Sequence, residues 1–200
     1  MPEFEFHFSP LGDSEMGNFG FTNWRMNMNS AFTKNDQAGG KQYYKFCSTL
    51  YHETHHAEQW FRCVQGVCKG TFPLPLFGRP NLPSSQRVAG HQAADIAQYM
   101  WVPVSVVNRA QATRMMFPTG QAELDAIRRW YDSIYGVRSS YRGRVLSTMG
   151  HDIAGYKRYL TLPEEVDAWN VEREFRRLLK SKAQQASEAY AFENFSSLFD

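Results

Sequence analysis

The chain has 200 residues, enough for one domain with a sizeable core, and its 42% hydrophobic and 15% aromatic content excludes a disordered protein. The 22 basic and 20 acidic residues are interspersed, and the net charge of +2 argues against nucleic acid or an anionic membrane surface as a partner. Three cysteines, an odd number within one expected helix, argue against a disulfide framework.

The first 30 residues predict a small antiparallel sheet. Phe4, Phe6 and Phe8 alternate with polar residues, which is the period of a half-buried strand. A second alternating run, over residues 19–28, follows a turn-prone stretch at residues 10–13. The two runs are therefore expected to pair as neighbouring strands.

Residues 41–69 predict one long amphipathic helix. Apolar side chains recur there at spacings of three and four, which places them on one face. Gly70 is expected to end the helix. The apolar positions are Tyr43, Phe46, Cys47, Leu50, Ala57, Trp60, Phe61, Val64 and Val67.

The rest of the chain is expected to be mostly helical. A proline-rich stretch at residues 72–85 can continue neither a helix nor a central strand, so it is interpreted as a loop. Helices are expected over residues 86–100 and 121–135 and from Pro163 to about residue 186, with residues 104–116 left ambiguous. The sequence thus predicts a single α+β domain over 1–200: a sheet at 1–30, a long helix at 41–69, and a mostly helical remainder at 86–200.

The long helix carries a pattern with a specific chemistry. His52, Glu53 and His56 match His-Glu-x-x-His, and residues four apart on a helix project from one face, so both imidazoles can bind one metal ion. Glu53 is then placed to take a proton from a water that zinc has made more acidic, and to pass it to the leaving group. The pattern predicts a zinc hydrolase. The alternative is a polar helix face with clustered histidines.

His55 offers a second way to form a metal site. It lies three residues after His52, so these two side chains can also share an ion, with His56 as a neighbour. The pair formed by His52 and His56 is preferred, because only that pair gives Glu53 the position of a general base.

A catalytic zinc usually takes three protein ligands and keeps one open position, so a third ligand is needed. Glu165 is the preferred candidate because it shares the apolar face of Ala168 and Trp169 near the start of a helix, where an unpaired carboxylate would be costly. The alternative is an acidic first turn stabilised by the helix dipole. The residues after the motif exclude the extended metzincin pattern. Rival third ligands are Glu164, His91 and Asp95.

Two short segments resemble a known family. His52 to Phe61 reads His-Glu-Thr-His-His-Ala-Glu-Gln-Trp-Phe, which resembles the His-Glu-x-x-His-x-x-Gln helix of metallopeptidase domains among bacterial contractile-injection and polymorphic-toxin effectors. Glu165-Val166-Asp167-Ala168 resembles their Glu-x-(Glu/Asp)-Ala element. The resemblance implies a zincin-like, gluzincin-like fold with zinc on His52, His56 and Glu165, Glu53 as general base, and Gln59 in support of the ligands.

An oxyanion stabiliser is also expected, because zinc alone seldom balances the charge of a tetrahedral intermediate. Tyr159 is the first candidate, and Tyr156, Arg144 and His151 are the others. The basic cluster over residues 172–182 also contains Glu172 and Glu174, and it is interpreted as a solvated helix face.

The predicted function is that of a zinc metallopeptidase, as a bacterial toxin or effector domain, acting on a protein or peptide. One alternative is a binding or structural module in which metal only staples the helices; another is a zinc hydrolase of a non-peptide amide or ester. A cognate immunity protein and a delivery apparatus are the further partners that the resemblance implies.

The expected location is the cytoplasm of the producing cell, with a secretion system as the route to a target cell. No apolar stretch reaches the roughly 20 residues that span a membrane, and the first residues lack the basic and apolar regions of a signal peptide.

Overall fold

The computed structural model describes residues 1–12, 15–32, 40–75, 92–150 and 152–196. This part of the chain is mostly helical with a small N-terminal sheet, so the predicted α+β class is confirmed. Among these residues, no helix combines the length and the apolar character needed to cross a membrane. The elements are β1 (Glu5–Ser9), β2 (Gly17–Gly20), β3 (Arg25–Asn29), η1 (Ser30–Phe32), α1 (Gly40–Lys69), α2 (Ala93–Met100), α3 (Val104–Ala112), η2 (Arg114–Met116), α4 (Gln121–Ile134), α5 (Ser139–Thr148), α6 (Ile153–Tyr159) and α7 (Pro163–Ser196).

The sheet is mixed, which corrects the prediction of an antiparallel sheet. Its strand order is β1-β3-β2: β2 and β3 are antiparallel, whereas β1 runs parallel to β3. Because the chain returns along β2 before it enters β3, β1 and β3 point the same way. Alternation of apolar and polar residues sets which face of a strand is buried, but it does not set strand direction.

Strand β2 lies close to α1 because its first residue is glycine. A Cβ atom at Gly17 would lie 2.8 Å from Sδ of Met28 and 3.0 Å from Cγ2 of Thr49, which is on α1. Met26 and Met28 of β3 are fully buried behind it. The small residue therefore allows the edge strand to approach the helix that carries the His-Glu-x-x-His pattern.

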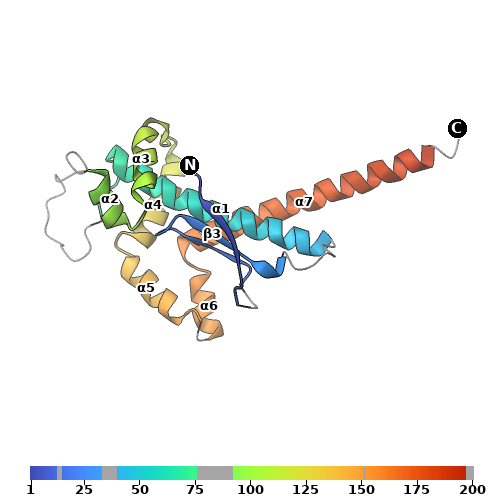
Figure 1. Ribbon diagram of the computed structural model, residues 1–200, viewed down its shortest axis with the longest axis horizontal. Helices are drawn as coiled ribbons and strands as arrows, with labels where there is room; N and C mark the ends of the chain where they lie inside the picture. Colours follow the sequence, from blue (N-terminus) through green and yellow to red (C-terminus); the bar gives the residue numbers. More distant parts are fainter. Residues whose placement is uncertain (13–14, 33–39, 76–91, 151, 197–200) are drawn as a thin grey trace.

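Helix α1 runs through the middle of the molecule, with the sheet, α3, α4 and α7 packed around it (Figure 1). The predicted helix over residues 41–69 is confirmed, and Gly70, with φ of +79°, ends it as expected. Its apolar face forms much of the core: Ala57, Val64 and Val67 are fully buried.

The other helices follow the sequence prediction in part. Helix α2 covers the end of the segment predicted over 86–100, of which 86–91 lie outside the described residues, as do residues 76–85 of the proline-rich stretch. The ambiguous segment 104–116 forms α3 and η2, and α4 matches its prediction. Helix α7 begins at Pro163 as predicted but continues to residue 196, and its distal half projects from the body (Figure 1).

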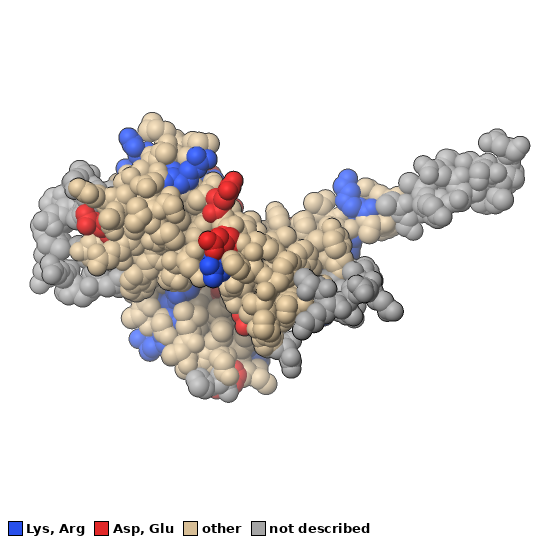
Figure 2. Space-filling model, viewed as in Figure 1, with Lys and Arg blue, Asp and Glu red and all other residues tan. Residues whose placement is uncertain are grey.

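The face shown in Figure 2 is mostly tan, with small groups of blue and of red atoms at separate places on it. This distribution agrees with the nearly balanced count of 22 basic and 20 acidic residues.

The core beside α1 gives a prediction for stability. Ile127 of α4 is fully buried in the cluster that contains Val64 and Val67. We expect Ile127→Ala to lower the free energy of unfolding by about 2–5 kcal/mol, because it removes buried methyl groups and leaves a cavity. Urea denaturation measures this loss. Val137→Ala, at a side chain that is 88% exposed, serves as the control, and an equal loss there would contradict the assignment of the core.

Candidate metal centre

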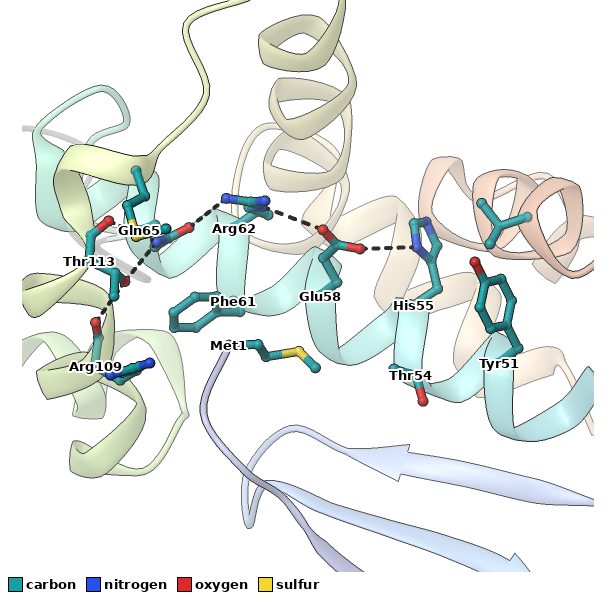
Figure 3. Close-up of a pocket in the computed structure, with 12 residues that line it drawn as sticks. Met1, Tyr51, Thr54, His55, Glu58, Phe61, Arg62, Gln65, Arg109 and Thr113 are labelled. Atoms are coloured by element: carbon teal, nitrogen blue, oxygen red, sulfur yellow. Dashed lines mark hydrogen bonds and ion pairs between the residues drawn. The ribbon is translucent and has the colours of Figure 1, made fainter. Parts of the chain in front are cut away.

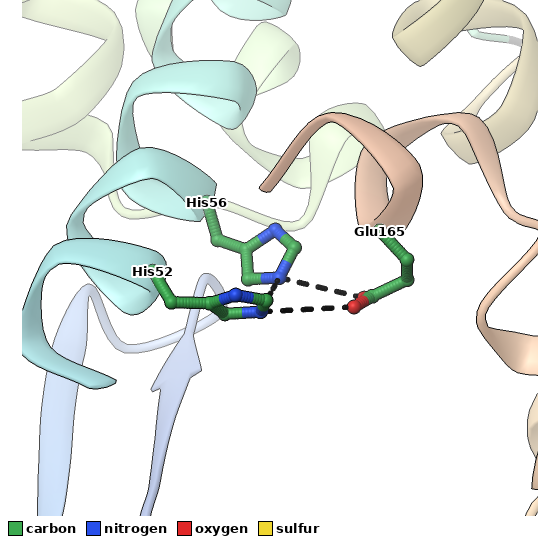
Figure 4. Close-up of side chains that lie close together, drawn as sticks. All are labelled: His52, His56 and Glu165. Atoms are coloured by element: carbon green, nitrogen blue, oxygen red, sulfur yellow. Dashed lines mark hydrogen bonds and ion pairs between the residues drawn. The ribbon is translucent and has the colours of Figure 1, made fainter. Parts of the chain in front are cut away.

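Three buried side chains from two helices converge in Figure 4: His52 and His56 of α1 and Glu165 of α7. Nε2 of His52 and Nε2 of His56 lie 3.2 Å apart. The Glu165 carboxylate lies 3.8 Å from Nε2 of His52 and 3.4 Å from Nε2 of His56. One ligand atom from each residue lies within 4.8 Å of the others, so this buried group could hold a metal ion.

The local sequence explains why these three residues meet. His52 and His56 are one turn apart on α1 and face the same side. Helix α7 begins at Pro163. Leu162 and Ala168 are buried, and Glu165, which lies between them in the chain, is buried as well. The third candidate ligand, Glu165, therefore lies in the first turn of α7, close to the two histidines.

Gln59 fixes the orientation of His56. Its amide Nε2 donates to the backbone carbonyl of Glu164 at 2.9 Å, so its Oε1 must face Nδ1 of His56, which is 2.8 Å away. Oε1 can only accept, and Nδ1 is therefore the protonated nitrogen. In the neutral imidazole, Nε2 of His56 then carries a lone pair that points at the metal position.

Glu172 does the same for His52, and this corrects an interpretation made from the sequence. Its Oε2 accepts a hydrogen bond from Nδ1 of His52 at 3.1 Å, while its other oxygen pairs with Arg176. Glu172 is 3% exposed, so it is not part of a solvated helix face. Arg173, Arg177, Lys180 and Lys182 are exposed as predicted, whereas Arg176 is partly buried.

The charges around the site favour a cation between these side chains. Burial lowers the pKa of His52, but its interactions with Glu165 and Glu172 outweigh this effect and raise the pKa well above the usual range. Burial likewise raises the pKa of Glu165, but the two imidazoles lower it overall. The carboxylates thus attract positive charge to the place where the imidazole nitrogens meet.

A metal ion fits the donor set. Oε2 of Glu165 is buried and has no hydrogen-bond partner among the described residues. When both imidazoles are neutral and protonated at Nδ1, their Nε2 lone pairs face each other across 3.2 Å, an arrangement that a cation between them would stabilise. A metal ion bound to Nε2 of each histidine and to Glu165 would satisfy all three groups.

Glu53 lies at the wall of a cavity beside this group. The cavity has a volume of about 500 Å³, and its lining includes Glu53, His56, Glu165 and Phe19. Desolvation raises the pKa of Glu53 to about 7, although His56, His52 and the backbone amide of Phe19 act against this shift. Glu53 lies outside the group of three candidate metal ligands.

Two tyrosines stand at the same cavity. Tyr159 and Tyr156 of α6 stack at a centroid distance of 6.2 Å, and both line the cavity together with Glu53. Burial, together with the Glu165 carboxylate, raises the pKa of Tyr159 far above its usual range. Of the other candidate oxyanion stabilisers, Arg144 is exposed and does not line this cavity, and His151 lies outside the described residues.

The structure places the rival ligands elsewhere. Nε2 of His55 lies 2.5 Å from Asp167, and His55 lines a separate pocket with Glu58 and Arg62 (Figure 3). Asp95 caps α2 through the backbone amide of Gln92, and His91 lies outside the described residues.

Glu164 lies outside the group of three converging side chains, and the sequence analysis did not identify its partner. Oε1 of Glu164 accepts a hydrogen bond from Nε of Arg142 at 2.6 Å. Arg142 also lies over the ring of Trp60, at 5.4 Å, and lines the cavity. No sequence pattern identified Arg142. For Glu172 a signal existed, since it follows Glu165 by seven residues and so lies on the same helix face.

The contact between Glu172 and His52 gives a prediction for metal affinity. We expect Glu172→Ala to weaken zinc binding by about 10–100-fold, because His52 loses the acceptor that fixes its tautomer. Glu172→Gln should retain part of the affinity, since its amide oxygen can still accept from Nδ1. Competition against a chromophoric chelator measures the change. Glu174→Ala, on an exposed position of α7, is the control. Equal affinity of Glu172→Ala and wild type would refute this role.

Comparison of the chain with protein-family models, with curated proteins and with solved structures finds no match. The function is therefore proposed from the chemistry of the site.

Proposed function

We propose that the protein is a zinc-dependent hydrolase that cleaves peptide bonds. One observation carries the proposal: the carboxylate of Glu53 lines the same cavity as His56 and Glu165. A metal held by these residues and the carboxylate of Glu53 would thus face a common space in which a substrate carbonyl and a water can meet. Zinc in such a site acts as a Lewis acid toward the carbonyl and lowers the pKa of the attacking water.

The donor set supports zinc as the ion. Two imidazoles and one carboxylate are the ligands of one class of catalytic zinc sites, in which a fourth position stays open. Magnesium and calcium prefer six or more oxygen donors. Among the described residues, the group at His52 instead offers two imidazole nitrogens and one carboxylate. Glu172 and Gln59 supply the acceptors that zinc-binding histidines usually have behind them.

The open cavity supports catalysis over a purely structural site. Structural zinc is usually enclosed by four protein ligands, whereas the group here has three candidate ligands, two of which line a cavity of about 500 Å³. Glu53 accepts the proton of the attacking water and passes it to the leaving nitrogen. Neither step would be needed if the metal only joined α1 to α7.

The sheet edge supports a peptide as substrate. Strand β2 is an edge strand, and Gly17, Asn18 and Phe19 line the cavity. The backbone of Phe19 interacts with Glu53, so the unpaired side of β2 faces the base. An extended peptide that adds a strand to β2 would bring its backbone to Glu53, and a non-peptide ester would not use this edge.

Tyr159 completes the proposed chemistry. Its raised pKa keeps the hydroxyl protonated at neutral pH, so it can donate a hydrogen bond to the developing oxyanion. The immunity protein and the delivery apparatus implied by the resemblance stay predictions.

Metal removal and reconstitution test the proposal. We expect the full chain loaded with zinc to bind about one ion and to cleave members of an internally quenched peptide library. A chelator should stop cleavage, and zinc should restore it. Zinc binding without cleavage of any peptide would favour the metal-stapled module, and cleavage of esters alone would favour the non-peptide hydrolase. A chain that binds no zinc would overturn the proposal.

A further inference from the structure

An apolar groove lies between the end of α6 and the first turns of α7. It has a volume of about 520 Å³, and its apolar wall consists of Tyr156, Leu160, Val166 and Trp169. Tyr156 is 46% exposed, Val166 44% and Trp169 36%. Large apolar side chains that share one groove and remain open to solvent are typical of a ligand-binding surface.

The groove continues into the metal centre. Tyr156, Trp169 and Glu172 line both the groove and a smaller cavity of about 250 Å³, which also contains His52, Glu53 and Glu165. The ring of Trp169 packs on the imidazole of His52, with centroids 4.8 Å apart. A chain bound at the metal therefore has a direct path into the groove.

The charges at the groove favour a bound chain in which an acidic residue stands next to the apolar residue that fills the groove. Arg173 lies at the rim and is exposed, and it donates to the side-chain oxygen of Asn170 at 2.7 Å. Arg176 also lines the groove, but its charge is balanced by Glu172. Arg173 thus leaves positive charge at the solvent side of an apolar wall.

We propose that this groove is a specificity subsite, which rests on the proposed peptidase function. It receives a large apolar side chain of the substrate, aromatic or leucine-like, close to the scissile peptide bond. Arg173 pairs with an acidic residue next to that side chain. The substrate class is therefore a polypeptide segment in which a bulky apolar residue adjoins an acidic one.

The size of the groove sets the expected preference. A volume of about 520 Å³ lies in the range of small-ligand pockets, and an aromatic side chain buries about 150–250 Å². Discrimination by apolar contact reaches about 10–200-fold for small differences in side-chain size. A charge pair at an exposed rim contributes less, about 2–5-fold.

A position-scanning library of quenched peptides, cleaved by the zinc-loaded full chain, tests the subsite. We expect one position to prefer Phe, Tyr, Trp or Leu over Ala by about 10–100-fold in kcat/KM. Val166→Trp fills the groove and should reduce this preference to less than about threefold without loss of zinc. Leu178→Trp is the matched control, because Leu178 is 54% exposed on the same helix and does not line the groove. It should keep the wild-type preference.

Arg173→Glu is a second, independent variant at an exposed position. It should change the preference at the adjacent position from acidic to basic residues and leave the apolar preference unchanged. The subsite is refuted if the chain cleaves peptides without an apolar preference, or if Val166→Trp leaves that preference unchanged. In both cases the proposed peptidase function still stands. If the zinc-loaded chain cleaves no peptide, the proposed function fails, and the subsite fails with it.

Discussion

Glu53→Gln is expected to abolish peptide cleavage while the protein keeps its zinc. The amide is nearly the same size as the carboxylate but cannot take a proton from the attacking water, and loss of a general base typically lowers kcat by about 10²–10⁴-fold. Glu53 lines the cavity but is not one of the three converging ligands, so metal content should stay at about one ion per chain. Elemental analysis and single-substrate kinetics measure the two quantities on one sample.

A matched control separates the loss of the base from the loss of a charge. Glu58 lies on the same helix, its side chain is 47% exposed, and it pairs with His55 and Arg62 away from the ligand group. Glu58→Gln should change kcat by less than about twofold, since exposed ion pairs contribute little. If Glu53→Gln turns over like Glu58→Gln, then Glu53 is not the base, and the proposed mechanism is wrong.

The sequence predicted the part of the site that depends on local periodicity. His52 and His56 share a face because of their spacing on a confirmed helix, and Glu165 points inward because its neighbours Leu162 and Ala168 are buried. Pro163 marked the start of α7. These inferences needed only the helix period and the cost of burying a carboxylate.

The parts that were missed depend on contacts between distant elements. Arg142 reaches the cavity from α5, which packs against α4 and α6, and no pattern within residues 139–148 contains that information. Whether β1 forms a parallel or an antiparallel pair depends on whether it joins β3 or β2, which alternation leaves open. Glu172 was assigned to the surface because its neighbours are basic, although its distance of seven residues from Glu165 pointed to the buried face.

Glu165→Ala is expected to remove the metal from the protein. It deletes the only carboxylate in the converging group. Loss of a residue that only supports a ligand lowers metal affinity by at most roughly 100-fold, and we expect the loss of Glu165 to lower zinc affinity by more than that. Because a metal that binds the folded state alone stabilises it by mass action, the rise in Tm that zinc causes in wild type should also disappear. Zinc titration followed by calorimetry measures both effects.

Glu164→Ala tests whether Glu165 or the preceding Glu164 binds the metal. Glu164 is fully buried and pairs with Arg142, so its removal leaves a partly buried guanidinium without its partner and should cost about 3–5 kcal/mol of stability. Zinc should still bind and still raise Tm, because the ligand group is intact. The opposite pattern, with zinc lost in Glu164→Ala and kept in Glu165→Ala, would show that the first turn of α7 presents the other carboxylate to the metal.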